Sequence, residues 1–141
     1  MIPPFRADGT LPPGEHGATW EEIEGRFGGN ERRRELLAGL KEVLNALRQA
    51  GCRRAWVDGS FVMDKPEPRD FDGCWDVTGA DWALVDPVLL DFGPGRLAQK
   101  RRFGGEMFFS DARAAALGTP FVEFFQRDRD GRPKGIIVID L

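Results

Sequence analysis

The sequence predicts an α/β domain in which a small mixed β-sheet is backed by helices. A long stretch over residues 31–50 repeats leucines at helical spacing, and its apolar stripe should pack on the sheet. Short runs rich in β-branched and aromatic residues lie near 53–58, 71–77, 105–109 and 135–140, and glycines and prolines separate them. These runs are the expected strands.

The composition is that of one folded domain. The chain has 141 residues, of which 41% are hydrophobic, and this is enough to bury a core. A net charge of -3 argues against a general nucleic-acid-coating protein but leaves room for local basic clusters. No apolar run approaches the ~20 residues that cross a bilayer, and the N-terminus lacks a signal-peptide layout. We therefore expect a cytoplasmic protein with no membrane partner, in which Cys52 and Cys74 are free thiols.

The N-terminal residues 1–18 are rich in proline and glycine. They are expected to form an extended surface arm rather than a helix or strand, and residues 19–141 are expected to form the domain. The chain's single histidine, His16, lies in this arm. With no second histidine nearby, it is expected to be structural or solvated rather than a ligand or a general base.

Two helices should follow the arm. Thr19 and Glu22 have the spacing of a capping box, and a short helix should stop at the glycine pair 28–29. Asn30 should cap the long helix, and Gly51 should end it.

The stretch 55–77, AWVDGSFVMDKPEPRDFDGCWDV, carries the most specific pattern. A β-prone run leads into a tight turn at Gly59-Ser60, and a second apolar run begins around Asp70 and Asp72. Because side chains alternate along a strand, the two aspartates should point the same way. Two carboxylates on one face repel each other unless a cation lies between them, and the usual one is a divalent ion such as Mg²⁺.

A Gly-Ser turn after a hydrophobic strand, then nine intervening residues and then Asp-x-Asp, resembles the signature of the DNA polymerase beta-like nucleotidyltransferase superfamily. The resemblance implies that Gly59 and Ser60 hold the tail of a nucleoside triphosphate, and that Asp70 and Asp72 hold catalytic Mg²⁺ or Mn²⁺ ions. It covers the first half of the fold. The whole chain also resembles a small group of bacterial proteins with this fold.

The connector after the turn departs from the family pattern. Pro66 and Pro68 allow at most about one helical turn over residues 61–65, whereas the family commonly has a longer helix that aims its amides at the triphosphate. The shortening affects the nucleotide pocket rather than the metal site. Lys65 could reach a phosphate there as a point charge.

The resemblance also implies a third carboxylate, on a strand next to the pair. Such a group completes the metal site and helps to deprotonate the attacking hydroxyl. Glu106 is the first candidate because it lies on a short strand between turn signals, and Asp91 is the alternative. Asp58 and Asp76 stand at strand ends, where a turn or cap explains them.

Basic residues gather in two places, and each has two explanations. A helix over 94–102 ends in the cluster 100–102, which suits the helix dipole or forms a cationic wall that draws in the nucleotide or an RNA end. A turn near the C-terminus is either a solvated loop or a surface for a partner or phosphate. Its basic residues are Arg127, Arg129, Arg132 and Lys134.

Two further segments have weaker patterns. A small-residue segment around 112–116 is expected to be a helix. A loop and short apolar segment over 78–91 should contribute to the core. Its core candidates are Trp82, Leu84, Val85, Val88, Leu89 and Leu90.

The expected function is that of a minimal nucleotidyltransferase, which transfers a nucleoside monophosphate from an NTP such as ATP to a hydroxyl of a protein or RNA. By analogy with compact enzymes of this kind, it would belong to a toxin-antitoxin or phage-defence module with a cognate partner protein. The alternative is a catalytically inactive binding or regulatory subunit with the same fold, which the shortened connector favours. A third reading is that the acidic pair only caps a turn.

Overall fold

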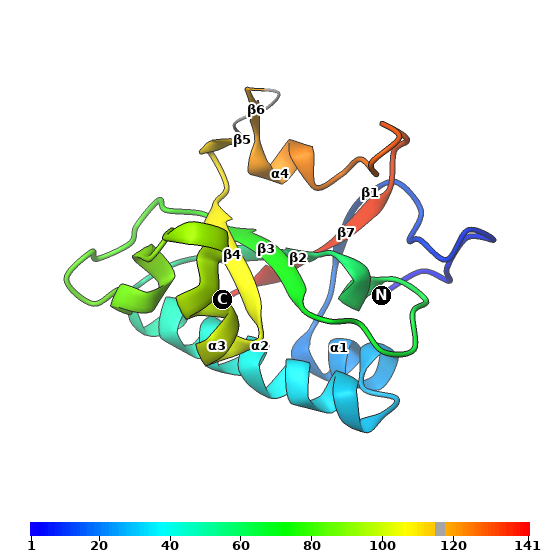
Figure 1. The fold of residues 1–141 in the computed structure, drawn as a ribbon, viewed down its shortest axis with the longest axis horizontal. Coiled ribbons are helices and arrows are strands. Elements are labelled where there is room, and N and C mark those ends of the chain that lie inside the picture. The colour runs from blue at the N-terminus through cyan, green and yellow to red at the C-terminus, as the bar shows by residue number, and fades with distance from the viewer. Residues whose placement is uncertain (115–117) are drawn as a thin grey trace.

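The computed structural model describes residues 1–114 and 118–141, which contain a five-stranded mixed sheet, a two-stranded sheet and four α-helices (Figure 1). The strands of the larger sheet are β1 (Gly14–Gly17), β2 (Arg54–Asp58), β3 (Phe71–Trp75), β4 (Gly105–Phe109) and β7 (Gly135–Asp140). The helices are α1 (Trp20–Phe27), α2 (Glu31–Gln49), α3 (Leu97–Phe103) and α4 (Phe121–Phe124). The predicted α/β class, with a mixed sheet and helices, is confirmed.

The strand order of the larger sheet is β1-β7-β2-β3-β4. β2 runs antiparallel to both of its neighbours, β7 and β3, while β1 pairs parallel with β7 and β4 pairs parallel with β3. The four strands expected from the sequence are all present, with ends that differ by two residues or fewer. The two segments that carry the expected site, β2 and β3, are therefore direct neighbours.

The first two helices begin where their capping residues predict. The Thr19 side chain accepts a hydrogen bond from the Glu22 amide, and the Glu22 carboxylate accepts one from the Thr19 amide. The Asn30 side chain caps α2 by accepting from the Arg33 amide. The apolar stripe of α2 packs on the sheet, and burying each such side chain contributes about 1.5 to 3 kcal/mol. Its buried members are Leu36, Leu37, Leu40, Val43, Leu44 and Leu47.

The expectation that residues 1–18 contain no strand was wrong for β1. Gly14–Gly17 pairs with β7 at the edge of the sheet, and Leu11 just before it is only 1% exposed. Its partner lies more than a hundred residues later in the chain, so local composition carried no sign of the pairing. His16 has its Nε2 atom 2.6 Å from the Pro12 carbonyl oxygen, as expected for a structural residue.

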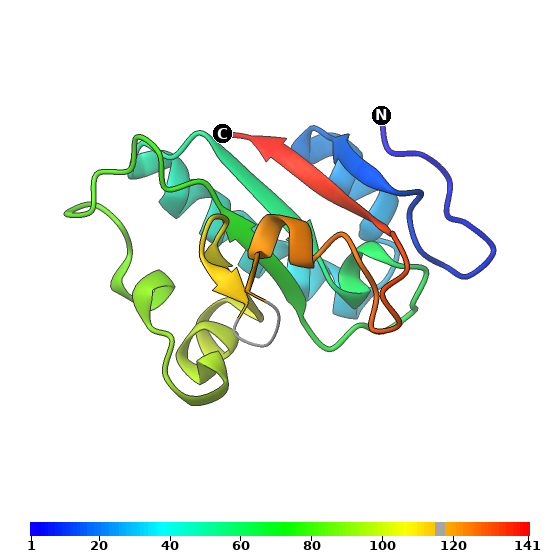
Figure 2. The same ribbon diagram turned by 90° about the horizontal axis from the view of Figure 1, so that it is seen from above.

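The two faces of the sheet have different covers (Figures 1 and 2). α1 and α2 lie against one face, where Phe71 and Trp75 of β3 belong to the main core. α4 lies over the other face, and a smaller cluster there includes Trp56, Cys74 and Phe125. Cys52 and Cys74 are both free and buried.

The segment between β3 and β4 is mostly turns. Short 3-10 turns at Pro87–Leu90 and Pro94–Arg96 precede α3, so the helix expected over 94–102 is largely present. Val85 and Leu89 are buried as expected, but Trp82, Leu84 and Leu90 are 50%, 60% and 37% exposed. Because this segment folds back in turns, only one side of it faces the core, and its other apolar side chains are exposed to solvent.

The helix expected around 112–116 is absent from its described part. Arg113–Ala114 forms β5, which pairs with β6 (Thr119–Pro120), while residues 115–116 lie outside the described residues. No helix in the described ranges is long and apolar enough to span a membrane.

Candidate functional site

Three carboxylates form a row across three neighbouring strands of the larger sheet, at one end of these strands. Asp58 of β2 is paired in register with Asp72 of β3, and Asp72 is paired with Glu106 of β4. Side chains directly opposite each other on neighbouring strands lie on the same face, with Cβ atoms about 4.5 to 5.5 Å apart. We call Asp58, Asp72 and Glu106 the carboxylate row.

Asp72 is the centre of this row and has the most perturbed acidity. Burial and, in decreasing order, the nearby carboxylates Asp70, Glu106 and Asp58 together raise the pKa of Asp72 to about 7. A side-chain hydrogen bond between Asp72 and Glu106 also favours the protonated form of Asp72. Near neutral pH a substantial fraction of Asp72 is therefore protonated instead of ionised.

Asp70 lies one residue before β3 and adjoins the row without belonging to it. Burial raises the pKa of its carboxyl group, and Glu106 adds to this, while Lys100, Arg32 and Arg69 act in the opposite direction. Asp70 thus raises the pKa of Asp72, but cations surround Asp70, whereas carboxylates surround Asp72.

The structure also distinguishes between the two candidates for a third carboxylate. Glu106 is hydrogen-bonded to Asp72 and is mostly buried, with 14% of its side chain exposed. Asp91 is exposed in the segment before α3, where its carboxylate accepts a hydrogen bond from the Gly93 amide. Glu106 is the candidate that adjoins Asp72. Asp76 accepts a hydrogen bond from the Thr78 amide, which is the turn role expected for it.

Basic side chains hold the two outer members of the row. Lys134, just before β7, forms an ion pair with Asp58, and both side chains are almost fully buried. Although Lys134 lowers the pKa of Asp58, the larger effect of burial leaves it raised. The sequence placed Lys134 in a basic turn and Asp58 at a strand end, so neither was expected to adjoin the site. Their pairing depends on β7 lying next to β2.

At the other end of the row, Arg96 and Lys100 hold Glu106. The Arg96 Nε atom lies 2.9 Å from Glu106 Oε2, and the Lys100 Nζ atom lies 3.7 Å from the same oxygen. Arg96 has φ 50° and ψ 40°, the left-handed region, which costs a non-glycine residue roughly 1 to 2 kcal/mol. Its guanidinium also lies 5.5 Å from the centre of the Phe108 ring. Sequence reasoning missed Arg96; the preceding Gly-Pro-Gly was the signal that the backbone turns sharply there.

The Gly59-Ser60 turn contacts the row directly. Gly59 has φ 84°, and a Cβ atom at this position would lie 2.6 Å from Asp72 Oδ2. Glycine is therefore required here both by the backbone conformation and by the space beside Asp72. The turn continues into a single 3-10 turn, Ser60–Val62, so the expected limit of about one helical turn is confirmed.

Arg33 holds the connector after this turn. Its guanidinium is buried and donates hydrogen bonds to the carbonyl oxygens of Phe61, Met63 and Lys65. A cation in the first turn of a helix is unfavourable to the helix dipole, and these hydrogen bonds offset that cost for Arg33. Lys65 itself is exposed, so its ammonium is accessible from solvent.

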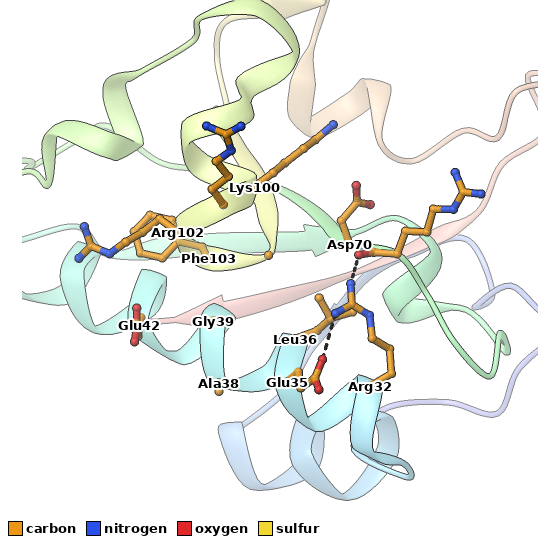
Figure 3. Close-up of a pocket in the computed structure, with 13 residues that line it drawn as sticks. Arg32, Glu35, Leu36, Ala38, Gly39, Glu42, Asp70, Lys100, Arg102 and Phe103 are labelled. Carbon is orange, nitrogen blue, oxygen red and sulfur yellow. Dashed lines mark hydrogen bonds and ion pairs between the residues drawn. The ribbon is translucent and has the colours of Figure 1, made fainter.

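A cleft opens on the other side of Asp70, between α2 and α3 (Figure 3). Its volume is about 430 Å³, and α2, α3 and the residues just before β3 form its walls. We call it the basic cleft because of its cationic side chains, which are Arg32, Arg69, Lys100, Arg101 and Arg102. Its carboxylates are Glu35, Glu42 and Asp70.

The donor atoms around Asp72 suit a hard divalent cation. Carboxylate oxygens are the ligands that Mg²⁺ prefers, and the residues that could supply them are Asp70, Asp72 and Glu106. Within residues 1–114 and 118–141, however, no three His, Cys, Asp or Glu side chains are arranged as a metal-holding group. In this arrangement Arg96 and Lys100 supply the positive charge beside Glu106.

Comparison with known proteins gives a family but no activity. The chain matches no curated protein and no solved structure. Residues 3–140 match the model of a family described as a family of unknown function (DUF6932). Since the match covers nearly the whole chain, this protein belongs to that family of unknown function.

Proposed function

We propose that the protein is a minimal nucleotidyltransferase, which moves a nucleoside monophosphate from an NTP to a hydroxyl group of an RNA or protein with Mg²⁺ or Mn²⁺. The observation that carries the proposal is the carboxylate row beside the Gly59-Ser60 turn. A buried row of like charges destabilises the fold unless a cation or a proton compensates it. A ligand that carries positive charge would supply this compensation at Asp72.

The residues that would hold the metal are Asp70, Asp72 and Glu106. They offer oxygen atoms only, and a divalent cation bound there would displace the proton that the raised pKa of Asp72 retains. Bound there, the ion would neutralise charge on the phosphates in the transition state. Glu106 would have to exchange its contacts with Arg96 and Lys100 for the ion.

The chain's own groups would position the substrates. The Gly59 amide and the Ser60 hydroxyl would bind the β- and γ-phosphates, and Lys65 would approach them from the exposed connector. The acceptor oxygen forms a bond to the α-phosphorus, the bond from that phosphorus to the bridging oxygen breaks, and pyrophosphate leaves with the electron pair. Glu106 would receive the acceptor's proton.

A catalytically inactive nucleotide-binding or regulatory subunit is the second candidate. It is favoured by the ion pairs that already neutralise Glu106 and by the short turn at Ser60–Val62. A cognate partner chain, as in two-component toxin-antitoxin or defence modules, would serve either candidate, and co-purification from the native cell would detect it.

Label transfer distinguishes the two candidates. The protein is incubated with each α-³²P-labelled NTP, Mg²⁺ or Mn²⁺, and a cell extract that supplies RNA and protein acceptors. If the protein is an enzyme, the wild type should produce labelled acceptor. The amount of label transferred should fall at least a hundredfold in Asp70→Ala, Asp72→Asn and Glu106→Gln. Asp140→Asn is the matched control, because Asp140 is an exposed carboxylate at the other end of the sheet. Nucleotide binding without transfer under every condition would support the inactive subunit.

A further inference from the structure

We propose that the basic cleft binds the phosphates of a single-stranded RNA, and that this RNA is the acceptor whose hydroxyl reaches the carboxylate row. The inference rests on the proposed function and narrows its acceptor from RNA or protein to RNA. Three observations carry it: the position of the cleft, the cations that are unpaired in it, and an aromatic side chain beyond it.

The cleft and the Gly-Ser turn lie on different sides of β3. The turn follows β2, whereas one wall of the cleft is α3, which precedes β4. Asp70 lines the cleft and also perturbs Asp72. Asp70 is therefore the point at which a second substrate held by the cleft would reach a nucleotide held by the turn, which is the arrangement a transfer between two substrates needs.

Two arginines of the cleft have no competing role in the fold. Arg69 and Arg101 are exposed, and neither side chain makes a hydrogen bond or ion pair with any residue that the structure describes. Arg32, in contrast, donates to the carbonyl oxygens of Pro68 and Arg69 and so positions the segment that carries Arg69. The cleft thus presents exposed cations that have no partner among the described residues, on a positioned backbone, as phosphate-contacting sites do.

A series of contacts leads from the cleft to an exposed aromatic ring. Lys100 lines the cleft and reaches Glu106; Glu106 also contacts Arg96. The Arg96 guanidinium lies over the Phe108 ring, and Phe92 stacks on that ring with a centroid distance of 6.1 Å and an interplanar angle of 14°.

Phe92 is 41% exposed and offers a platform for an unpaired base. Cations followed by an accessible aromatic ring suit a single-stranded nucleic acid better than an acidic peptide, which has no base to stack. The polarity of the lining also separates this cleft from an apolar small-molecule pocket.

Fluorescence anisotropy with a short labelled single-stranded RNA tests the proposal. Arg69→Ala/Arg101→Ala should raise the Kd about tenfold and make its salt dependence shallower, because two phosphate contacts are lost. Phe92→Ala should raise the Kd about tenfold with an unchanged salt dependence. Arg53→Ala/Arg54→Ala is the matched control, since it removes the same charge from exposed positions around the start of β2 and should leave the Kd unchanged.

The outcomes separate this inference from the proposed function. Equal loss of RNA binding in both double variants would mean non-specific attraction and would overturn it. Tighter binding of an acidic peptide than of RNA would also overturn the inference. The same holds if Arg69→Ala/Arg101→Ala loses Mg²⁺-NTP binding but keeps RNA binding. If RNA binding depends on the cleft but no NTP raises the Tm, the cleft assignment stands and the transfer activity fails.

Discussion

Asp72 and Glu106 are paired in register across β3 and β4, and the proximity of Glu106 raises the pKa of Asp72. Asp58 on the other side of Asp72 is in register too, so the sheet itself places three acidic groups side by side. Such an arrangement makes the stability of the fold depend on pH.

The first prediction concerns pH. Asp72 has an ordinary pKa of 3.8 and a folded pKa of about 7, so between these values the folded chain holds a proton that the unfolded chain has released. The free energy of unfolding should fall as pH rises from about 4 to 7, by about 1 to 4 kcal/mol, and stay reduced above 7. Urea unfolding of wild type and Asp72→Asn at several pH values measures this.

Asp72→Asn should remove much of that dependence and make the protein more stable than wild type at pH 8. Asp140→Asn, at an exposed site, should follow the wild-type curve. Parallel curves for wild type and Asp72→Asn would contradict the raised pKa.

The second prediction concerns the turn beside Asp72. Gly59→Ala places a methyl group 2.6 Å from Asp72 Oδ2 at a residue with φ 84°. Gly131→Ala is a closely matched control, because Gly131 has φ 80° and no atom within 4 Å of the new Cβ. Both should lose about 1 kcal/mol to the backbone, and Gly59→Ala should lose about 1 to 3 kcal/mol more. If urea unfolding shows the same loss of unfolding free energy in both variants, the space beside Asp72 does not restrict residue 59.

The third prediction concerns the buried ion pair. Lys134→Met leaves Asp58 charged and unpartnered in a buried position, which should lower the free energy of unfolding by about 3 to 5 kcal/mol at pH 8. The loss should be smaller at pH 5, where Asp58 can take up a proton. Adding Asp58→Asn to Lys134→Met should recover most of it, and failure to recover would mean that Lys134 acts through packing alone.

The fourth prediction concerns Arg96 as the cation that now compensates Glu106. Arg96→Ala keeps the left-handed backbone but frees the carboxylate, so the apparent Kd for Mn²⁺, measured as a rise in Tm, should fall several-fold. Arg54→Ala removes an arginine from an exposed ion pair with Asp140 and should have no effect. A weaker Mn²⁺ response in Arg96→Ala would show that Arg96 assists the site instead of competing for it.

Much of the architecture was predictable because its signals are local. Capping at Thr19 and Asn30 involves residues three positions apart, and the stripe of α2 repeats within one helix. The Asp-x-Asp spacing likewise identified Asp70 and Asp72, and the turn signals around 105–109 identified the strand of Glu106.

The remainder of the site depends on strand pairing between distant parts of the chain. Asp58 lies in the row only because β2 and β3 pair in this register, and Lys134 reaches it only because β7 is next to β2. The edge strand β1 was missed for the same reason.

The amino-acid sequence by itself determined the class of the fold, the limits of its main helix and strands, and the acidic pair with its glycine turn, since each follows from backbone preferences over a few residues. The tertiary structure decided which charges face each other. A one-residue change of register would turn every side chain of a strand to the opposite face, so the row exists only in the folded sheet.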